Sequence, residues 1–470
     1  MKYIIRMRHH NQNHSSNPLN AVIGYMGSHL GEISYYLTAT LIVVWALPGS
    51  IAIRNFLLGF GFLFSLLFLF KNRRLLKIKS TLPIYVFLTL FVWVLAHYLW
   101  IGTDSKVQFH ELRSLWARVF AAVTMAMACG VFIQQTEKPK RLLILAFYSI
   151  PIFTFIYYLY GSFKSHHFLL PNDFVGLYLI NKVNAAFTTA IGVSVSVAIL
   201  LYGYLNQQSS KNKHFQWALL GILICLLSAT LASSKNGVAI SIILLCFAVL
   251  YGMSIGLLGK SLKQFYWKPI MVFLTIMFLA GVFHSKFASP GWSHLIEDIQ
   301  ISTQIEKYQN WKDTPRLGFP QRPDGSYVAG NTYERFAWAT KGVELIQKYP
   351  LGYGTVNQGS FKHLLIRDGI PYPNDNQTHS GWIDFGLAFG IPGLLILFGT
   401  LFSCIKFAFK KKDQFSMIAI WLSMAIFLAC WVEEVSFKHT FEMWMFFTAF
   451  ACSLIIQVPQ KVNYESMPIE

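Results

Sequence analysis

Charged side chains are scarce in this chain of 470 residues: 13% are Asp, Glu, Lys or Arg, while 54% are hydrophobic. A soluble globule of this composition would leave large apolar faces in water. The alternation of apolar and polar residues that is typical of a membrane β-barrel is missing as well. The sequence therefore predicts an all-α polytopic membrane protein.

Several functional signatures are also missing. The six cysteines have no CxxC spacing and no nearby histidine partners, so we expect neither disulfides nor a zinc site. A Walker phosphate loop is absent, which leaves nucleotide-driven transport without support. The first 30 residues have no apolar core before a cleavage site, so the first membrane span is the expected targeting signal. We expect no cofactor.

What the sequence does contain is a series of apolar runs of about 20 residues, each long enough to cross a bilayer as a helix. They predict twelve spans: Ile33–Ile53, Asn55–Phe70, Leu82–Trp100, Leu115–Ile133, Leu142–Tyr160, Ala185–Leu205, Trp217–Ala232, Val238–Leu258, Pro269–Phe283, Ile383–Phe409, Met417–Trp431 and Phe441–Ile456. The predicted organisation is a tail at 1–32, nine spans within 33–283, a loop domain at 284–382, three spans within 383–457 and a tail at 458–470.

The net charge of +18 is spread over alternate loops rather than one face or one tail, so it does not indicate nucleic-acid binding. Basic residues follow the even-numbered spans, for example Arg73 after the second and Lys411 after the tenth. Cytoplasmic loops carry such an excess of Lys and Arg. Both termini are therefore predicted inside the cell, and the loop domain outside the inner membrane.

The predicted loop domain is polar, aromatic and rich in Gly and Pro, and it is far longer than an ordinary helix connection. Helices are expected at Ser293–Trp311 and Tyr333–Gln347. In the second helix, the spacing of Phe336, Val343 and Ile346 predicts the apolar face. A tight turn is predicted after Pro350.

His379 is the first candidate for chemistry, because it lies where the loop returns to the membrane. An imidazole can take a proton from a hydroxyl group near neutral pH. The alternative is a helix cap or an ordinary hydrogen-bond partner, which is the more common role of a single interfacial histidine.

Four segments together resemble the core of the O-antigen ligase and polymerase superfamily. They are Arg335-Phe336-Ala337-Trp338, Tyr349-Pro350-Leu351-Gly352-Tyr353-Gly354, His379-Ser380-Gly381-Trp382 and Gly390-Ile391-Pro392-Gly393. The resemblance implies a GT-C-like helical fold and a metal-independent glycosyltransferase. Such an enzyme moves a glycan from undecaprenyl diphosphate to the lipid A-core oligosaccharide at the periplasmic face, in lipopolysaccharide biosynthesis. Its partners would be this donor, this acceptor and membrane lipids.

The resemblance also implies site roles. His379 takes the role of base, and Arg335 that of diphosphate clamp, since a guanidinium can bind two oxygens together. Trp338 belongs to the same segment and is a possible supporting residue. The family usually has Ser-Arg between two middle spans, where this chain has Ser234 and Lys235. Lysine retains the charge but loses the bidentate geometry.

Three further residues are assigned two readings each. Lys182 joins the phosphate site or serves as an interfacial anchor. Glu433 and Glu434 lie at the outer end of the eleventh span. One reading is that they orient His379 or a cation, and the other is that they are solvated acidic residues at a helix end.

The resemblance leaves the reaction open in part. A polymerase of repeat units or a protein O-oligosaccharyltransferase would share the fold and the donor. A secondary transporter is a more distant alternative, because twelve spans with both ends inside suit a transporter as well. Transporters place ionisable groups near the membrane centre, whereas the predicted spans are nearly free of charge and the candidate groups gather at their outer ends.

Overall fold

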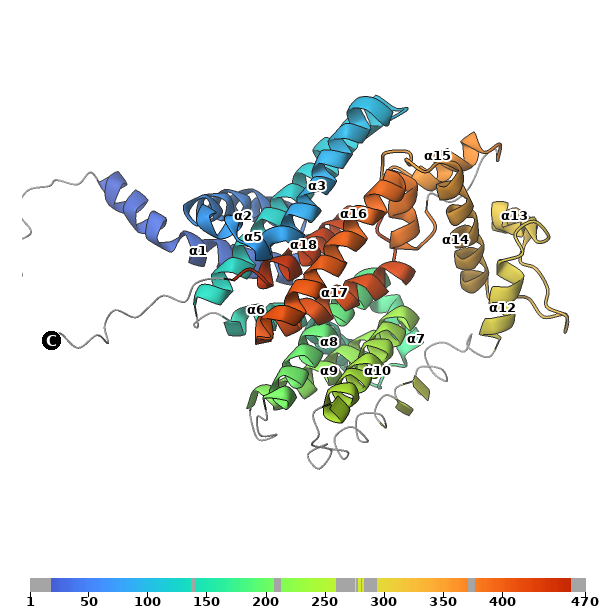
Figure 1. The fold of residues 1–470 in the computed structure, drawn as a ribbon. Helices are drawn as coiled ribbons and strands as arrows, with labels where there is room; N and C mark the ends of the chain where they lie inside the picture. The colour runs from blue at the N-terminus through green and yellow to red at the C-terminus, as the bar shows by residue number, and fades with distance from the viewer. Residues whose placement is uncertain are drawn as a thin grey trace, which may run out of the picture.

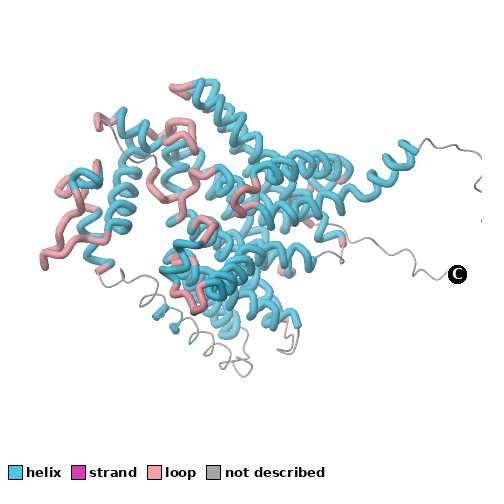
Figure 2. The backbone as a smooth tube through the Cα atoms, turned by 180° about the vertical axis from the view of Figure 1, so that it is seen from behind, coloured by secondary structure: helices cyan, strands magenta, loops and turns pink. Residues whose placement is uncertain are grey.

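The structure is a computed structural model that describes residues 18–136, 140–206, 213–258, 275, 278–279, 281–282, 294–370 and 377–457. Helices make up the ordered elements of these ranges, with a single isolated bridge between Gln321 and Tyr327. Figure 2 shows the helices in cyan, with the longest loops collected at one side of the molecule. The predicted all-helical class is confirmed.

Eleven long helices form the bundle of the described residues (Figure 1). They are α1 (Pro18–Val44), α2 (Ile51–Lys71), α3 (Leu82–Ala96), α5 (Ala117–Gln135), α6 (Lys140–Lys164), α8 (Lys182–Leu205), α9 (Lys213–Leu231), α10 (Lys235–Leu258), α16 (Gly381–Lys411), α17 (Gln414–Val432) and α18 (Lys438–Leu454).

Further helices lie in the connections between them. They are α4 (Ser105–Glu111), α7 (Pro171–Leu177), α12 (Leu295–Ser302), α13 (Thr314–Leu317), α14 (Gly330–Lys348) and α15 (Ser360–Arg367), with 3₁₀ turns at Arg73–Lys77, Lys79–Thr81 and Gln309–Lys312. Two π-helical turns, His97–Ile101 and Leu112–Trp116, flank α4.

Nine helical segments of the described chain are long and apolar enough to cross a membrane. The chain is thus a multi-pass membrane protein, although the nine segments leave the predicted count of twelve unconfirmed. Of the three other predicted spans, Ile33–Ile53 and Phe441–Ile456 overlap α1 and α18, and Pro269–Phe283 lies almost entirely outside the described residues.

The first predicted span is misplaced. Helix α1 begins much earlier, at Pro18, and ends at Val44, and a turn precedes α2 at Ile51. The Ser50 hydroxyl donates to the carbonyls of Val44 and Leu47, which stabilises this turn. The residues of this turn are themselves mostly apolar, so apolar length alone does not show that the helix ends there.

Helix α18 lies at the centre of the bundle, with every residue from Thr440 to Leu454 buried. It packs most extensively on α5. Gly130 of α5 permits this, because a Cβ there would lie only 1.7 Å from the Ser453 hydroxyl oxygen. Membrane helices use small residues in this way to let their backbones approach closely.

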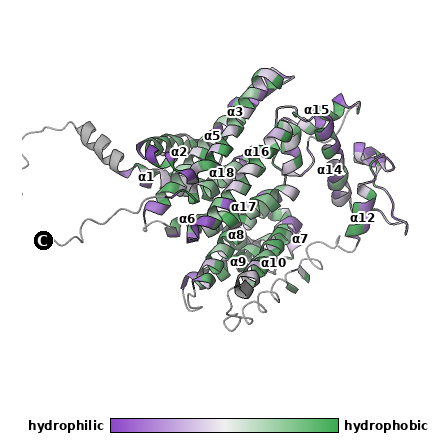
Figure 3. Ribbon diagram, viewed as in Figure 1, coloured by the Kyte–Doolittle hydropathy of each residue, from purple (hydrophilic) through white to green (hydrophobic). Residues whose placement is uncertain are grey.

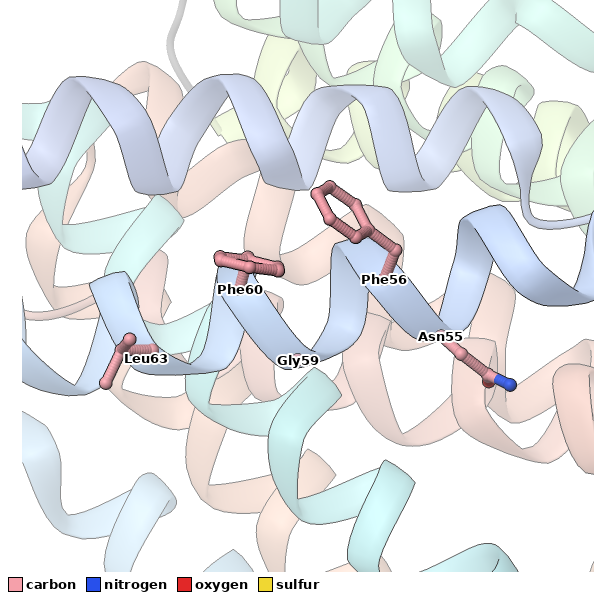
Figure 4. A pocket seen from close by; sticks show the side chains of 5 residues that line it. All are labelled: Asn55, Phe56, Gly59, Phe60 and Leu63. Atoms are coloured by element: carbon pink, nitrogen blue, oxygen red, sulfur yellow. The ribbon is translucent and has the colours of Figure 1, made fainter.

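The outer faces of the bundle are apolar, as Figure 3 shows along the long helices. On α2, a shallow hollow of about 260 Å³ is lined by Asn55, Phe56, Gly59, Phe60 and Leu63. Figure 4 shows these side chains on successive turns of the helix. Ionisable groups are missing from this lining, so the hollow is a dent in a face suited to lipid rather than a place for chemistry.

The long connection between α10 and α16 contains α12 to α15, which gather at one end of the bundle (Figure 1). The predicted helix Ser293–Trp311 is confirmed only in its first part, where α12 spans Leu295–Ser302. Its second part is wrong, because the chain leaves the helix after Ser302 and a 3₁₀ turn begins only at Gln309. Trp311 is nevertheless buried, with its indole N–H donating to the Ile305 carbonyl.

Helix α14 matches the predicted helix Tyr333–Gln347, but its buried face differs from the predicted one. Tyr333, Ala337, Trp338, Gly342 and Leu345 point inward. Phe336 and Val343 are 38% and 45% exposed. Tyr333 and Trp338 are the large aromatic residues that this face buries, while the residues chosen from spacing alone lie beside it.

Helix α16 is broken at Gly390, where φ is 66° and ψ is −167°. The Pro-Leu-Gly-Tyr-Gly segment fills the break: Tyr353 N and Gly354 N donate to the Leu387 and Ala388 carbonyls. In return, Ile391 N donates to the Pro350 carbonyl at 2.8 Å. Two of the family-like segments thus satisfy each other's backbone hydrogen-bonding groups. These bonds also hold the first part of α16 (residues 381–389), which begins two residues after His379.

Candidate functional site

His379 lies in a tight bend just before α16 and has a positive φ of 59°, which is uncommon for a residue other than glycine. The neighbouring side chains fix this bend. Asp384 accepts hydrogen bonds from Thr378 N at 2.7 Å and from Thr378 Oγ1 at 2.8 Å. The position of the imidazole is therefore set by the start of α16 rather than by a mobile loop.

The imidazole is held on two sides. Its Nδ1 lies 3.1 Å from Glu434 Oε2, just beyond the end of α17. Its ring stacks on Trp338 of α14, with centroids 5.4 Å apart and planes at 25°. The side chain of His379 remains 26% exposed, so the structure fixes the ring and still leaves it open to a second molecule.

Glu434 is 7% exposed and also accepts a hydrogen bond from Ser436 Oγ at 2.6 Å. Burial acts to raise its pKa, but the hydrogen bonds from His379 and Ser436 outweigh this and hold the pKa below its ordinary value. A carboxylate of this kind fixes the orientation of the imidazole and stabilises the imidazolium that forms when the ring takes a proton.

Arg335 lies one turn before Trp338 on α14. Its Nη1 donates to the Val432 carbonyl at 3.0 Å, and Asn236 Nδ2 donates to the same carbonyl at 2.8 Å. Lys235, the first residue of α10, interacts electrostatically with Arg335. The ends of α10, α14 and α17 thus bring two cationic groups close together, and α14 links them to His379 through Trp338.

Glu433 lies beneath these cations and is 3% exposed. Burial raises its pKa to about 8, against the opposing effects of Arg335 and Asn236. A neutral Glu433 does not compete for the guanidinium, so Arg335 is held by a carbonyl and retains its charge for an anion.

No described contact joins Lys182 to this cluster, so its place in the phosphate site stays a prediction. It is exposed at the start of α8. Nearby on α8, Asn184 pairs with His439 of α18 at 2.8 Å and with Thr440 of α18 at 2.9 Å, while Ala186 lies against Gly237 of α10.

The inner charges of the bundle were missed by sequence reasoning, and the expectation of spans nearly free of charge needs correction. Arg118 of α5 pairs with the fully buried Glu442 of α18, with Nε and Oε1 2.6 Å apart. Arg54 of α2 is buried nearby and donates to the Trp45 carbonyl. The signal was present, because Arg118 is the fourth and Glu442 the second residue of a predicted span.

The fold and the site define a multi-pass membrane protein with a histidine, a carboxylate and two cations clustered at one end of the bundle. The model of the O-antigen ligase family matches residues 218–398. This region is therefore identified with the O-antigen ligase family, whose members are membrane glycosyltransferase-like enzymes that act as ligases or polymerases. The match includes Lys235, Arg335 and His379 and ends before Glu433 and Glu434. No curated protein matches the chain.

Proposed function

We propose that the protein is an O-antigen ligase that transfers a glycan from undecaprenyl diphosphate to the lipid A-core oligosaccharide, without a metal, at the periplasmic face of the inner membrane. The observation that carries this proposal is the clamped but accessible His379, paired with Glu434 and linked through Trp338 to Arg335.

The reaction breaks the bond between the anomeric carbon of the glycan and the diphosphate oxygen, and forms a bond from that carbon to an acceptor oxygen. His379 takes the proton of the acceptor hydroxyl. Because Nδ1 faces Glu434, Nε2 is the nitrogen that accepts it. Attack opposite the leaving group inverts the anomeric carbon.

The leaving diphosphate carries away the electron pair of the broken bond, and its charge must be stabilised as it departs. Arg335 and Lys235 supply two positive charges for this purpose. Arg335 can bind two phosphate oxygens in parallel, while Lys235 acts as a point charge.

The orientation that we propose follows from the basic residues. Lys71, Arg73 and Arg74 lie at the end of α2, and Lys410 and Lys411 at the end of α16. By the positive-inside rule these ends are cytoplasmic, so His379, at the opposite end of α16, faces the periplasm.

The test is a transfer assay with purified protein in lipid nanodiscs, with lipid-linked glycan as donor and either lipid A-core or lipid-linked repeat unit as acceptor. We expect glycan on lipid A-core with the wild type and its loss with His379→Ala. Elongation of lipid-linked repeat unit alone would identify a polymerase. Normal transfer by His379→Ala would refute the assigned base.

A further inference from the structure

Glu111 is a buried carboxylate outside the cluster around His379, at the last residue of α4. It is 1% exposed, yet its contacts run to the loop between α14 and α15. Glu111 Oε1 accepts from Val356 N at 2.6 Å, and Oε2 accepts from Asn357 N at 2.9 Å. Both carboxylate oxygens thus hold one turn of backbone that is remote in sequence.

The corner around α4 grips the same loop at two more points. Gln108, one turn before Glu111 on α4, donates from Nε2 to the Tyr353 carbonyl at 2.8 Å. His97 Nε2 lies 3.1 Å from the Leu351 carbonyl. His97 opens one of the two π-helical turns, and the other begins directly after Glu111. Such turns change the direction of side chains and are frequent at functional sites.

The gripped loop leads back to the cluster around His379. The Asn357 side-chain amide donates to the Ser436 carbonyl, and Ser436 Oγ donates to Glu434 Oε1 at 2.6 Å. Glu434 in turn holds His379 Nδ1. The carboxylate that orients the imidazole is therefore placed by a short loop after α17, and Asn357 fixes that loop from outside.

We propose that Glu111 is a positioning residue for His379, acting through Asn357, Ser436 and Glu434. Two neighbouring backbone amides donate to the two oxygens of Glu111, and such paired hydrogen bonds are directional, so Glu111 sets where Asn357 lies. Asn357 then sets Ser436 and the Glu434 carboxylate. This inference rests on the glycan transfer proposed above.

The test compares Glu111→Gln with Glu344→Gln, a matched change at an exposed residue of α14 that pairs with Lys341 on the surface. The Glu111→Gln variant keeps the shape of the side chain, but only its one amide oxygen can accept a hydrogen bond from the two backbone amides. A poorly positioned His379 lowers the rate of the chemical step, but it does not weaken the binding of the donor. We expect kcat to fall about 10- to 100-fold with little change in KM for the donor, and wild-type kinetics for Glu344→Gln.

A double-mutant cycle separates positioning from general support of the fold. If Glu111 acts through Glu434, adding Glu111→Gln to Glu434→Gln lowers kcat little further. Effects that multiply, or a Glu111→Gln enzyme with normal kcat, would overturn the proposal.

A second variant covers the case in which Glu111→Gln does not fold. Asn357→Ala leaves the backbone contacts of Glu111 in place and removes only the bond to Ser436. We expect the same fall in kcat and the same non-additivity with Glu434→Gln, and additive effects would again refute the relay. Failure of the proposed function has a different signature, since the wild type and Glu344→Gln would then transfer no glycan.

Discussion

Gly390 is a position at which a single added methyl group should destabilise the protein strongly. Its φ of 66° and ψ of −167° belong to a region that other residues enter at a cost of about 1–3 kcal/mol. A Cβ there would lie 2.1 Å from the Pro350 oxygen and 2.5 Å from the Leu351 carbonyl carbon. Both are backbone atoms, so no side-chain rotation relieves the clash.

We expect Gly390→Ala to push the Pro350 segment away and to break the bond from Ile391 N to the Pro350 carbonyl, which contributes about 1 kcal/mol. Together with the backbone cost, the loss of stability is about 2–4 kcal/mol. Because this segment positions the start of α16, glycan transfer should fall as well.

The assay is thermal unfolding of purified protein in detergent, beside the transfer reaction. Gly399→Ala is the matched control on the same helix: a Cβ there meets only Val86 Cγ1 at 3.8 Å, so the variant should unfold at or above the wild-type temperature. A Gly390→Ala protein as stable and active as Gly399→Ala would show that the break in α16 is not needed.

Three other predictions follow from the charged groups. Removing one partner of the buried pair, as in Arg118→Ala, should destabilise the bundle by about 3–5 kcal/mol, and the apolar double change Arg118→Met with Glu442→Leu should recover most of this in detergent unfolding. Glu433 ionises with a pKa of about 8 when folded and about 4.5 when unfolded, so its burial should lower the stability progressively from about pH 4.5 to pH 8. Glu433→Gln should abolish that loss, whereas an unchanged pH profile of unfolding would contradict the buried state. Lys235→Arg should keep or lower KM for the lipid-linked donor and Lys235→Ala should raise it about tenfold or more, while an equal KM in both would separate Lys235 from the phosphate.

Sequence reasoning performed well wherever one local property decides the outcome. Apolar length predicted α8, α10, α16 and α17 close to their observed bounds, because burial in lipid depends on composition over some 20 residues. It failed where contacts with other residues determine the structure. At the turn before α2, hydrogen bonds from Ser50 end the helix, and in α14 the buried face is the one whose aromatic residues pack against α12 and α16.

The same division applies to the candidate site. His379, Arg335 and Lys235 could be named in advance because their segments resemble those of the O-antigen ligase superfamily, and because His379 lies where the loop returns to the membrane. The pairing of His379 with Glu434 rather than Glu433 could not, since adjacent residues after a helix end point in different directions. Arg335 of α14 donates to the Val432 carbonyl at the end of α17 and lies near the buried Glu433, while Glu434 faces the imidazole.

The positions of the charges also indicate how a lipid-linked donor would lie. Ionisable groups are costly within hydrocarbon unless they are paired, and Arg118 inside the bundle has its partner in Glu442. Arg335, by contrast, is hydrogen-bonded only to a carbonyl among the described contacts, that of Val432 at the end of α17. In the proposed reaction, this positive charge would bind the diphosphate of a donor whose isoprenoid remains in the bilayer. The partly exposed His379 would then meet an acceptor that arrives from the aqueous side.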